Sequence, residues 1–421
     1  KNFFSDKGCI IQSIKKKNKI LKNDLKFNIL KETSQIKNLS IKTKIRKASI
    51  NSKEIKNNDI FFAIKGKNKD GNKFVKEAFT KGACLAVVNK INKSAKKNKQ
   101  IKVKNSLNFL TKTSKIIRQN SSSKIIAITG SCGKTSLKEM LKETLNKFGK
   151  VSSSPKSFNN KYGVPLSLFN LNPKHDYGVF EIGMDKKGEI NFLSKIIKPD
   201  VGVITNISYA HAKNFKNINQ IAMAKSEIIN NINANGVLVL NFDDRFFSLH
   251  KKIAIKKKLK VLTFSMNKKA NVRLKYIKKE KNKFKISIII NNKNKYFYIS
   301  CNFKNFIKNL LATITIISIF KNPTKLDKNI FYNFNVPKGR GDISKIKIKK
   351  KNIDIINIYV PNGNPIDTEK YTYKLNWIDL FIKEIENKLK NNIPLIIAGD
   401  FNIIPEEKDA YAPEKYINDA L

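Results

Sequence analysis

Four short apolar runs in the middle of the chain are each followed by polar residues. Their length and their content of β-branched residues predict buried strands. These runs span residues 125–128, 177–180, 201–205 and 237–240. Because helical patterns separate them, we expect a mostly parallel sheet whose strands end at one common edge. The fold class predicted for the chain is therefore α/β.

Weaker patterns on both sides of this region predict two further units. Strands at 60–64 and 84–88 around a helix at 73–81 indicate a small N-terminal α/β domain, and the polar residues 120–123 then form a linker. Near the C-terminus, apolar residues at helical spacing lie between two further apolar runs. We therefore divide the chain into an N-terminal domain (1–120), a central domain (121–340) and a C-terminal α/β segment (341–421).

A glycine-bounded turn follows the first central run and leads into an amphipathic helix. The turn reads GSCGKTS, from Gly130 through Ser131, Cys132, Gly133, Lys134 and Thr135 to Ser136. Glycines allow a tight turn that points backbone N–H groups at phosphate oxygens, while the lysine reaches the terminal phosphates and the threonine holds Mg²⁺. A simple turn with a solvated lysine is the alternative, but the strand–loop–helix context favours nucleotide binding. Ile128 replaces the first glycine of the usual motif, which argues against a generic P-loop NTPase.

Polar side chains follow the other central runs. Glu181, Asn206 and Asn241 each come at the end of a predicted strand, so they should converge with Thr135 around the nucleotide. Glu181 is the natural second ligand for Mg²⁺, which prefers oxygen ligands. A single glutamate in such a place is often only a solvated or capping residue.

Two other residues carry little information by themselves. His211 is one of only three histidines, and by itself its sequence context favours a surface or packed imidazole. Lys225 lies in a predicted helix, where the pattern favours a solvated lysine.

The charge balance is strongly basic, with 85 Lys and Arg against 32 Asp and Glu and a net charge of +53. The excess is spread along the whole chain as Lys, which resembles an AT-rich coding bias, so we expect only non-specific binding to nucleic acid. The four cysteines form no C-x-x-C pair, which suggests a reducing cytoplasm rather than a zinc site or disulfides. The longest oily run, 310–320, is too short to cross a membrane. We expect a cytoplasmic monomer.

From about residue 48 to about residue 350, the motifs together resemble the Mur ligase family. They are NSKEIKNNDIFFAIKG, KDGNKF, TGSCGKTSLKEML, SFNNKYGVPLSL, EIGMDKKGEI, TNISYAHAKNF, IAMAKSEI, LNFDD and GRGD. The resemblance implies an ATP- and Mg²⁺-dependent ligase of peptidoglycan synthesis. Its implied substrates are UDP-N-acetylmuramoyl-tripeptide and D-Ala-D-Ala, which are joined through an acyl phosphate.

The resemblance also assigns roles to residues. It implies that Lys134 stabilises the transferring phosphoryl group, that Thr135 and Glu181 bind one Mg²⁺, and that His211 helps Glu181 to place a second. Lys225 matches a lysine that is carbamylated in the family and acts as a metal ligand. The adenosine of ATP would contact Asn241 and Arg340, and the UDP-muramoyl substrate would contact Asn159 and Asn160.

Departures from the family pattern lie in the N-terminal domain. Where the pattern for holding UDP reads Asp-Ser-Arg, this chain has Asn51, Ser52 and Lys53, and Asn72 replaces a usual histidine. We assign Ser52 and Lys53 to substrate binding. Lysine gives up the bidentate contact that arginine can make, so the affinity for uridine is expected to be weaker.

The segment from about residue 352 instead resembles exonuclease III of the endonuclease/exonuclease/phosphatase family. IYVPNGNP and IAGDFNIIP are its hallmarks, and the resemblance implies that Asp400 and Asn402 activate water while Tyr359 approaches the scissile phosphate. The glutamate segment of that family is missing, so we predict no nuclease activity. A diverged Mur C-terminal domain is the competing interpretation, because it shares the order of Tyr, Asn, Pro and Gly-Asp.

Three hypotheses follow. The first is a Mur ligase with an intact ATP site and a foreign third domain, in which ligation is impaired. The second is a Mg²⁺-dependent nuclease fragment that acts on DNA. The third is an inactive chimera.

Overall fold

The structure is a computed structural model of the whole chain. It describes residues 24–36, 39, 44–66, 68–209, 214–300, 306–334, 346–348, 351–364, 366–390, 393–404 and 406–409. Two predicted site residues, His211 and Arg340, lie outside these ranges.

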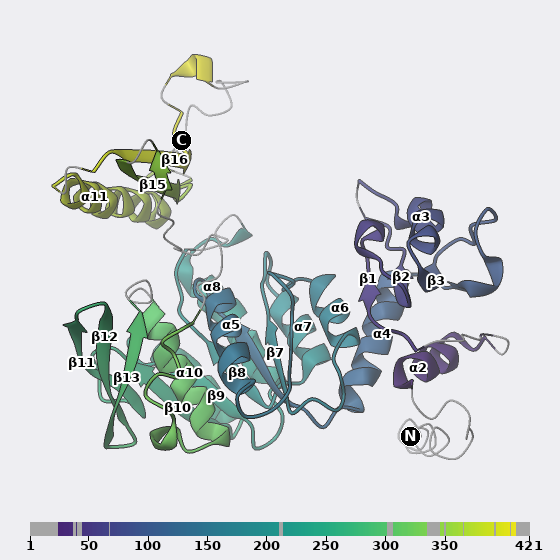
Figure 1. Cartoon of the computed structure of the whole chain (residues 1–421), viewed down its shortest axis with the longest axis horizontal. Coiled ribbons are helices and arrows are strands. Elements are labelled where there is room, and N and C mark those ends of the chain that lie inside the picture. The colour runs from purple at the N-terminus through teal and green to yellow at the C-terminus, as the bar shows by residue number, and fades with distance from the viewer. Residues whose placement is uncertain are drawn as a thin grey trace.

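The N-terminal part contains a four-stranded parallel sheet in the order β1-β2-β3-β4 (Figure 1). Its strands are β1 (Ala48–Ser49), β2 (Asp59–Phe62), β3 (Ala83–Val88) and β4 (Gln100–Lys102). Its helices are α2 (Leu25–Ser34), α3 (Val75–Thr80) and α4 (Ser106–Gln119). The predicted strands at 60–64 and 84–88 are thus present with shifted ends, and the predicted helix at 73–81 begins as a 3-10 turn, Gly71–Phe74.

The central part is built on a nine-stranded sheet in the order β13-β12-β11-β10-β9-β8-β5-β7-β6. The parallel strands are β5 (Lys124–Thr129), β6 (Val151–Ser153), β7 (Tyr177–Glu181), β8 (Val201–Ile204), β9 (Val237–Asn241) and β10 (Lys260–Ser265). The antiparallel extension consists of β11 (Val272–Glu280), β12 (Lys283–Ile290) and β13 (Lys293–Ser300). The prediction of a mostly parallel α/β sheet is confirmed.

Helices cover both faces of the central sheet, which explains why its strands read as continuous apolar runs. They are α5 (Lys134–Leu145), α6 (Gly163–Phe169), α7 (Glu189–Ile197), α8 (Ile218–Ser226), α9 (Phe247–Lys256) and α10 (Ile307–Phe320). Along β5, Ile126 and Ile128 point into the core that α5 and α10 share, whereas Ile125 and Ala127 point into the core on the other face. This alternation of side chains holds the strand, and therefore the loop that follows it, from both sides.

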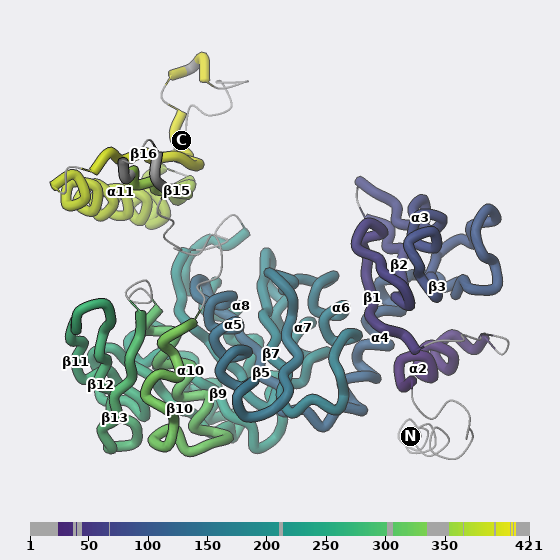
Figure 2. Tube along the Cα trace, viewed as in Figure 1, coloured from purple at the N-terminus to yellow at the C-terminus, as the bar shows by residue number. Residues whose placement is uncertain are grey.

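The C-terminal part has a three-stranded sheet in the order β14-β15-β16. Its elements are β14 (Ile346–Ile348), β15 (Lys351–Tyr359), α11 (Glu369–Leu389) and β16 (Leu395–Asp400). The tube view shows it above the central part, on the opposite side of the molecule from the N-terminal sheet (Figure 2). Tyr373 of α11 lies against Tyr209, with 6.2 Å between ring centroids.

The amphipathic helix predicted in this segment is present, but its apolar face is not fully covered. Leu375, Ile382 and Leu389 are 44%, 49% and 55% exposed. They recur every seven residues and so lie along one stripe of the helix, which drifts by only about 20° per heptad. Ile378, Phe381 and Ile385 of the same helix are half-buried.

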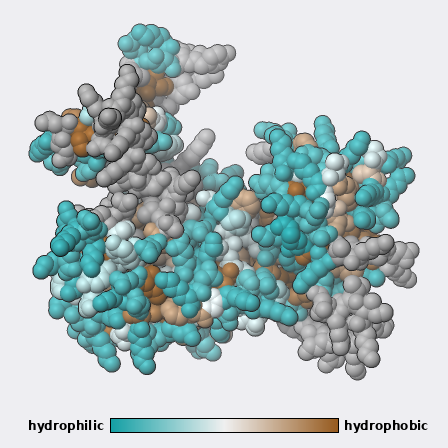
Figure 3. Space-filling view, viewed as in Figure 1, coloured by the Kyte–Doolittle hydropathy of each residue, from teal (hydrophilic) through white to brown (hydrophobic). Residues whose placement is uncertain are grey.

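The molecular surface is mainly hydrophilic. Lysine-rich strands and helices give the visible face of the central and N-terminal parts its polar character, with small hydrophobic patches between them (Figure 3). Among the helices that the structure describes, none combines the length and the apolar composition needed to span a bilayer.

Candidate active site

The loop between β5 and α5 has the backbone that its glycines predict. Gly130 has φ +143° and Gly133, which caps α5, has φ +81°. A Cβ atom on Gly130 would lie 1.9 Å from the Thr205 Oγ1 atom, so no other residue fits there. The loop therefore delivers the N-terminus of α5, with its free N–H groups, to the carboxyl edge of the sheet.

The end of β8 anchors this loop. Ser131 donates its backbone N–H to the Asn206 carbonyl at 2.9 Å, and Cys132 donates its own to the Asn206 side-chain oxygen at 2.9 Å. Thr205 donates its hydroxyl to the Cys132 carbonyl at 2.7 Å. Asn206 thus converges on the site as predicted, but its side chain is engaged in shaping the loop.

Two lysine ammonium groups meet at one carbonyl oxygen of the loop. Lys134 Nζ donates to Gly130 O at 2.8 Å and to Ser131 O at 3.2 Å. Lys225 Nζ donates to the same Gly130 O at 3.1 Å. Two like charges in a buried place repel each other strongly, and an anion that neutralises them would be bound there.

Lys225 is 1% exposed, so the expectation of a solvated helical lysine was wrong. Burial, followed by the nearby charge of Lys134, lowers the pKa of Lys225 from 10.5 to about 7. A large fraction of this amine is therefore uncharged near neutral pH. Perturbed groups of this kind concentrate at functional sites.

Glu181 closes the other side of the loop. Its carboxylate accepts hydrogen bonds from Thr135 Oγ1 and from Asn159 Nδ2, each at 2.8 Å, and the residue is 1% exposed. A buried carboxylate beside a threonine hydroxyl at the end of a phosphate-binding loop is a suitable oxygen donor set for Mg²⁺. Within the ranges given above, no three His, Cys, Asp or Glu side chains form a metal cluster, and His211 is not among those residues.

Two predicted asparagines make local hydrogen bonds. Asn160 Oδ1 accepts from the backbone N–H groups of Tyr162 and Gly163 at the start of α6. Asn241, at the end of β9, accepts from the Asp243 N–H at 3.0 Å. Both side chains therefore shape turns at the edge of the sheet where Thr135 and Glu181 lie.

Sequence reasoning missed Asn309. Its side-chain amide donates to the Gly133 carbonyl at 3.3 Å, so the start of α10 touches the turn of the loop. The only signal for it was a polar residue near the beginning of a long oily run.

The N-terminal residues predicted to hold the substrate lie elsewhere on the molecule. Ser52 donates its hydroxyl to Glu77 at 2.8 Å, and Lys53 is exposed. Asn72, which departs from the family pattern, accepts the Asn89 backbone N–H at 2.9 Å. The replaced histidine position thus has a structural role in this chain.

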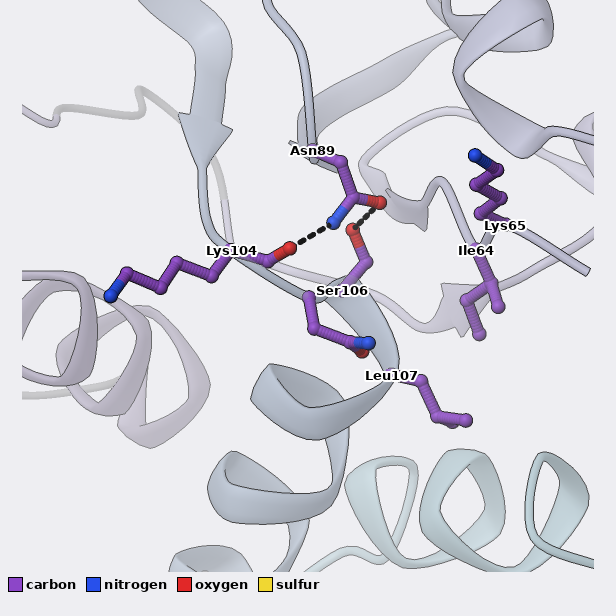
Figure 4. A pocket seen from close by; sticks show the side chains of 7 residues that line it. Ile64, Lys65, Asn89, Lys104, Ser106 and Leu107 are labelled. Atoms are coloured by element: carbon purple, nitrogen blue, oxygen red, sulfur yellow. Dashed lines mark hydrogen bonds between the residues drawn. The ribbon is translucent and has the colours of Figure 1, made fainter.

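A pocket of about 230 Å³ lies next to Asn89, at the carboxyl ends of the first sheet (Figure 4). Its lining consists of Ile64, Lys65, Asn89, Lys104, Asn105, Ser106 and Leu107. The Asn89 amide donates to the Lys104 carbonyl at 2.8 Å and accepts the Ser106 hydroxyl at 3.2 Å. The pocket has two lysines on its rim and the first turn of α4 as one wall.

The three nuclease-like residues come together at the end of the C-terminal sheet. Tyr359 and Asp400 are partners across β15 and β16, and Asn402 donates its side-chain amide to the Val360 carbonyl at 2.6 Å. Tyr359 is 68% exposed and Asp400 is also exposed. These residues form an open edge rather than an enclosed site.

Comparisons with known proteins match the N-terminal and central parts. The family described as "Mur ligase middle domain" matches residues 128–317, and the one described as "Mur ligase family, catalytic domain" matches residues 44–118. Both leave the C-terminal segment uncovered, and nothing in these comparisons supports its nuclease-like interpretation.

Individual relatives agree with this match. The UDP-N-acetylmuramoyl-tripeptide–D-alanyl-D-alanine ligase of Rickettsia prowazekii is 34% identical over 73% of this chain and 68% of its own length. The ligase of the same name from Buchnera aphidicola is 32% identical over 81% and 70%. The structure of MurF from Acinetobacter baumannii superposes with a TM-score of 0.67 at 26% identity, covering 79% of this chain and 73% of that one.

A fourth similar protein holds a nucleotide. MurF ligase from Thermotoga maritima, solved in complex with ADP, has a TM-score of 0.63 at 26% identity over 75% of this chain and 72% of that one. The shortened phosphate loop, the paired lysines and the buried glutamate fit this likeness. The chain belongs to the Mur ligase family and is an ATP-dependent ligase of the MurF type.

Proposed function

We propose that this protein joins D-alanyl-D-alanine to UDP-N-acetylmuramoyl-tripeptide in the cytoplasm, as a monomer, with ATP as the energy source. The names of the relatives supply the substrates. The observation that carries the proposal is the meeting of Lys134 and Lys225 at Gly130 O, directly beside the Thr135–Glu181 pair. That arrangement suits the transfer of a phosphoryl group between two anions, the nucleotide and the substrate carboxylate.

The loop and the start of α5 bind the phosphates of ATP. Lys134 leaves its carbonyl partners, extends to the terminal phosphate and offsets the charge that grows as the phosphoryl group moves to the substrate carboxylate. The acyl phosphate that forms has a carbonyl carbon that the amine of D-Ala-D-Ala attacks. A tetrahedral intermediate then releases phosphate and leaves the new amide bond.

Thr135 and Glu181 would hold Mg²⁺, which would neutralise phosphate charge and orient the terminal phosphoryl group. The donor set fits that ion, because both are oxygen ligands and the buried carboxylate accepts hydrogen bonds from two uncharged groups, the Thr135 hydroxyl and the Asn159 amide. Asn159 fixes the rotation of the Glu181 carboxylate. His211 contributes to a second metal position in the same proposal.

Lys225 is suited to carbamylation because its amine is partly uncharged near pH 7. An uncharged amine attacks CO2 at carbon, forms a carbamate and releases one proton. The product replaces a cation beside Lys134 with an anion, which removes the repulsion between the two lysines and creates another oxygen ligand.

The UDP-linked substrate binds toward the N-terminal sheet. Ser52 and Lys53 contact the nucleotide of this substrate, and Asn159 and Asn160 contact its muramoyl end. Asn241 and Arg340 contact the adenosine of ATP. The Lys65–Lys104 pocket adds positive charge on that side of the molecule.

ADP release measured with all three substrates tests the proposal. We expect ADP formation that requires both UDP-N-acetylmuramoyl-tripeptide and D-Ala-D-Ala, and a loss of about 10³-fold in turnover in Lys134→Ala. Lys142→Met, a partly exposed position on the same helix, is the matched control and should behave like the wild type. Unchanged activity in Lys134→Ala would refute the ligase assignment for this site.

A further inference from the structure

A second buried lysine of α5 has no part in the steps described so far. Lys138 is 0% exposed and lies one helical turn after Lys134. Burying an ammonium group is costly unless a counter-charge and hydrogen-bond acceptors compensate for it. Glu139 supplies the counter-charge, with 3.1 Å between Lys138 Nζ and Glu139 Oε1.

The acceptor for Lys138 is the carbonyl oxygen of Lys156, in the stretch SPKSFNN. We call residues 154–160 the asparagine loop. Lys156 has φ +47°, a left-handed conformation that a non-glycine residue adopts only when its surroundings hold it there. The bond from Lys138 is such a constraint, and it joins the nucleotide-binding helix to this loop.

The C-terminal end of the asparagine loop contacts the Glu181 carboxylate. The Asn159 side-chain amide donates to the Glu181 carboxylate, and its backbone carbonyl accepts the Gly183 N–H, each at 2.8 Å. At the N-terminal end, Ser154 Oγ accepts the Glu181 backbone N–H at 3.3 Å. The loop is thus fixed at both ends to β7 and the residues that follow it, while the Lys138 side chain joins its middle to α5.

We propose that Lys138 is a positioning residue, which holds the asparagine loop so that Asn159 keeps the Glu181 carboxylate and the incoming UDP-linked substrate in register with the ATP loop. The substrate part of this statement rests on the function proposed above. Lys138 acts through the loop backbone and does not touch the reacting atoms. Its effect should therefore fall on the substrate and on turnover, and not on nucleotide affinity.

The test compares variants on one helix. Lys138→Met keeps the apolar stem but removes the donor, whereas Lys142→Met removes a lysine whose side chain is 43% exposed and whose partner is the same Glu139, at 3.5 Å. Glu139→Gln removes the counter-charge from both. For Lys138→Met we expect a 10- to 100-fold loss in kcat/KM for the UDP-linked substrate, since small misplacements of reacting groups have effects of about this size.

In Lys138→Met, ADP affinity should stay within about twofold of the wild type, which follows from the intact ATP loop. Lys142→Met should match the wild type throughout. Adding Lys156→Gly to Lys138→Met should restore part of the activity, because glycine adopts the left-handed conformation without the bond. If Lys138→Met does not fold, Lys138→Gln replaces it, because its amide is too short to reach the carbonyl.

Equal kcat/KM in Lys138→Met and Lys142→Met would overturn the proposal. So would a parallel fall in ADP affinity and thermal stability, which would mark Lys138 as a general stability element. Amide hydrogen exchange of residues 154–160, measured without substrates, keeps this result separate from the proposed function. Faster exchange in Lys138→Met than in Lys142→Met supports the positioning role even if the wild type ligates a different substrate.

Discussion

The central loop and the C-terminal edge both place chemically capable side chains at the end of a strand, but in opposite surroundings. In the central part, Lys134, Glu181 and Lys225 are 9%, 1% and 1% exposed. In the C-terminal part, Tyr359 is 68% exposed and one face of the β15–β16 pair carries Ile355 and Ile396 in the open. The first group lies between two layers of helices, and the second lies on a sheet that one helix covers.

This difference matters for chemistry. Charges that are removed from water interact several times more strongly than charges at the surface, so the buried groups can perturb one another and a bound phosphate. The exposed residues of the C-terminal edge are screened by solvent and salt. A similar strand-end motif thus has catalytic value in one place and little in the other.

The largest effect should come from Glu181→Gln. The substitution keeps the size of the side chain and an oxygen for hydrogen bonding but removes the negative charge, so we expect turnover to fall about 10³-fold, equivalent to ~4 kcal/mol. Steady-state rates across a Mg²⁺ titration measure it. Glu280→Gln, on β11, is the control. A variant with wild-type turnover would show that burial at this position does not serve catalysis.

Lys225 should make stability depend on pH. Its pKa is about 7 in the folded protein and 10.5 when free, so between these values the unfolded chain holds one more proton. The free energy of unfolding therefore rises with pH, by about 1.4 kcal/mol per unit.

Urea unfolding in CO2-free buffer at pH 7 and pH 9 checks this. Relative to Lys225→Met, the wild type should gain roughly 2–3 kcal/mol over that range, while Lys142→Met should track the wild type. A flat difference would mean that Lys225 keeps its ordinary pKa.

The sequence was informative where structure depends on the local backbone. Gly130 and Gly133 predicted the loop because a tight turn with positive φ values strongly favours glycine. Burial of Lys225 and Lys138 could not be predicted, since it depends on long-range packing that brings Lys225 to the Gly130 carbonyl and Lys138 to the Lys156 carbonyl. The asparagines were ambiguous for a related reason: Asn159 contacts Glu181 whereas Asn160 caps a turn, and neighbouring residues of one type give no local sign of that difference.

The C-terminal sheet should unfold before the central part, because one of its faces is uncovered. Trp377 on α11 is the only tryptophan of the chain, so its fluorescence reports this segment alone. Its transition in urea should precede the loss of circular dichroism. Tyr373→Ala, which removes the contact with Tyr209, should lower the Trp377 transition by about 1 kcal/mol and leave ADP affinity unchanged. Coincident transitions would instead show that the two parts unfold as one unit.

The smallest expected effect concerns the nuclease-like edge. We expect no Mg²⁺-dependent cleavage of abasic-site DNA, because Asp400 and Tyr359 are solvent-exposed and nothing described around them encloses a scissile phosphate. DNA binding would not indicate nuclease activity, since a net charge of +53 attracts any polyanion at low salt. Cleavage must therefore be compared with that of Asp400→Asn: a trace that persists in the variant comes from elsewhere, whereas clear cleavage that the substitution abolishes would give the open edge a catalytic role and erase the contrast with the buried site.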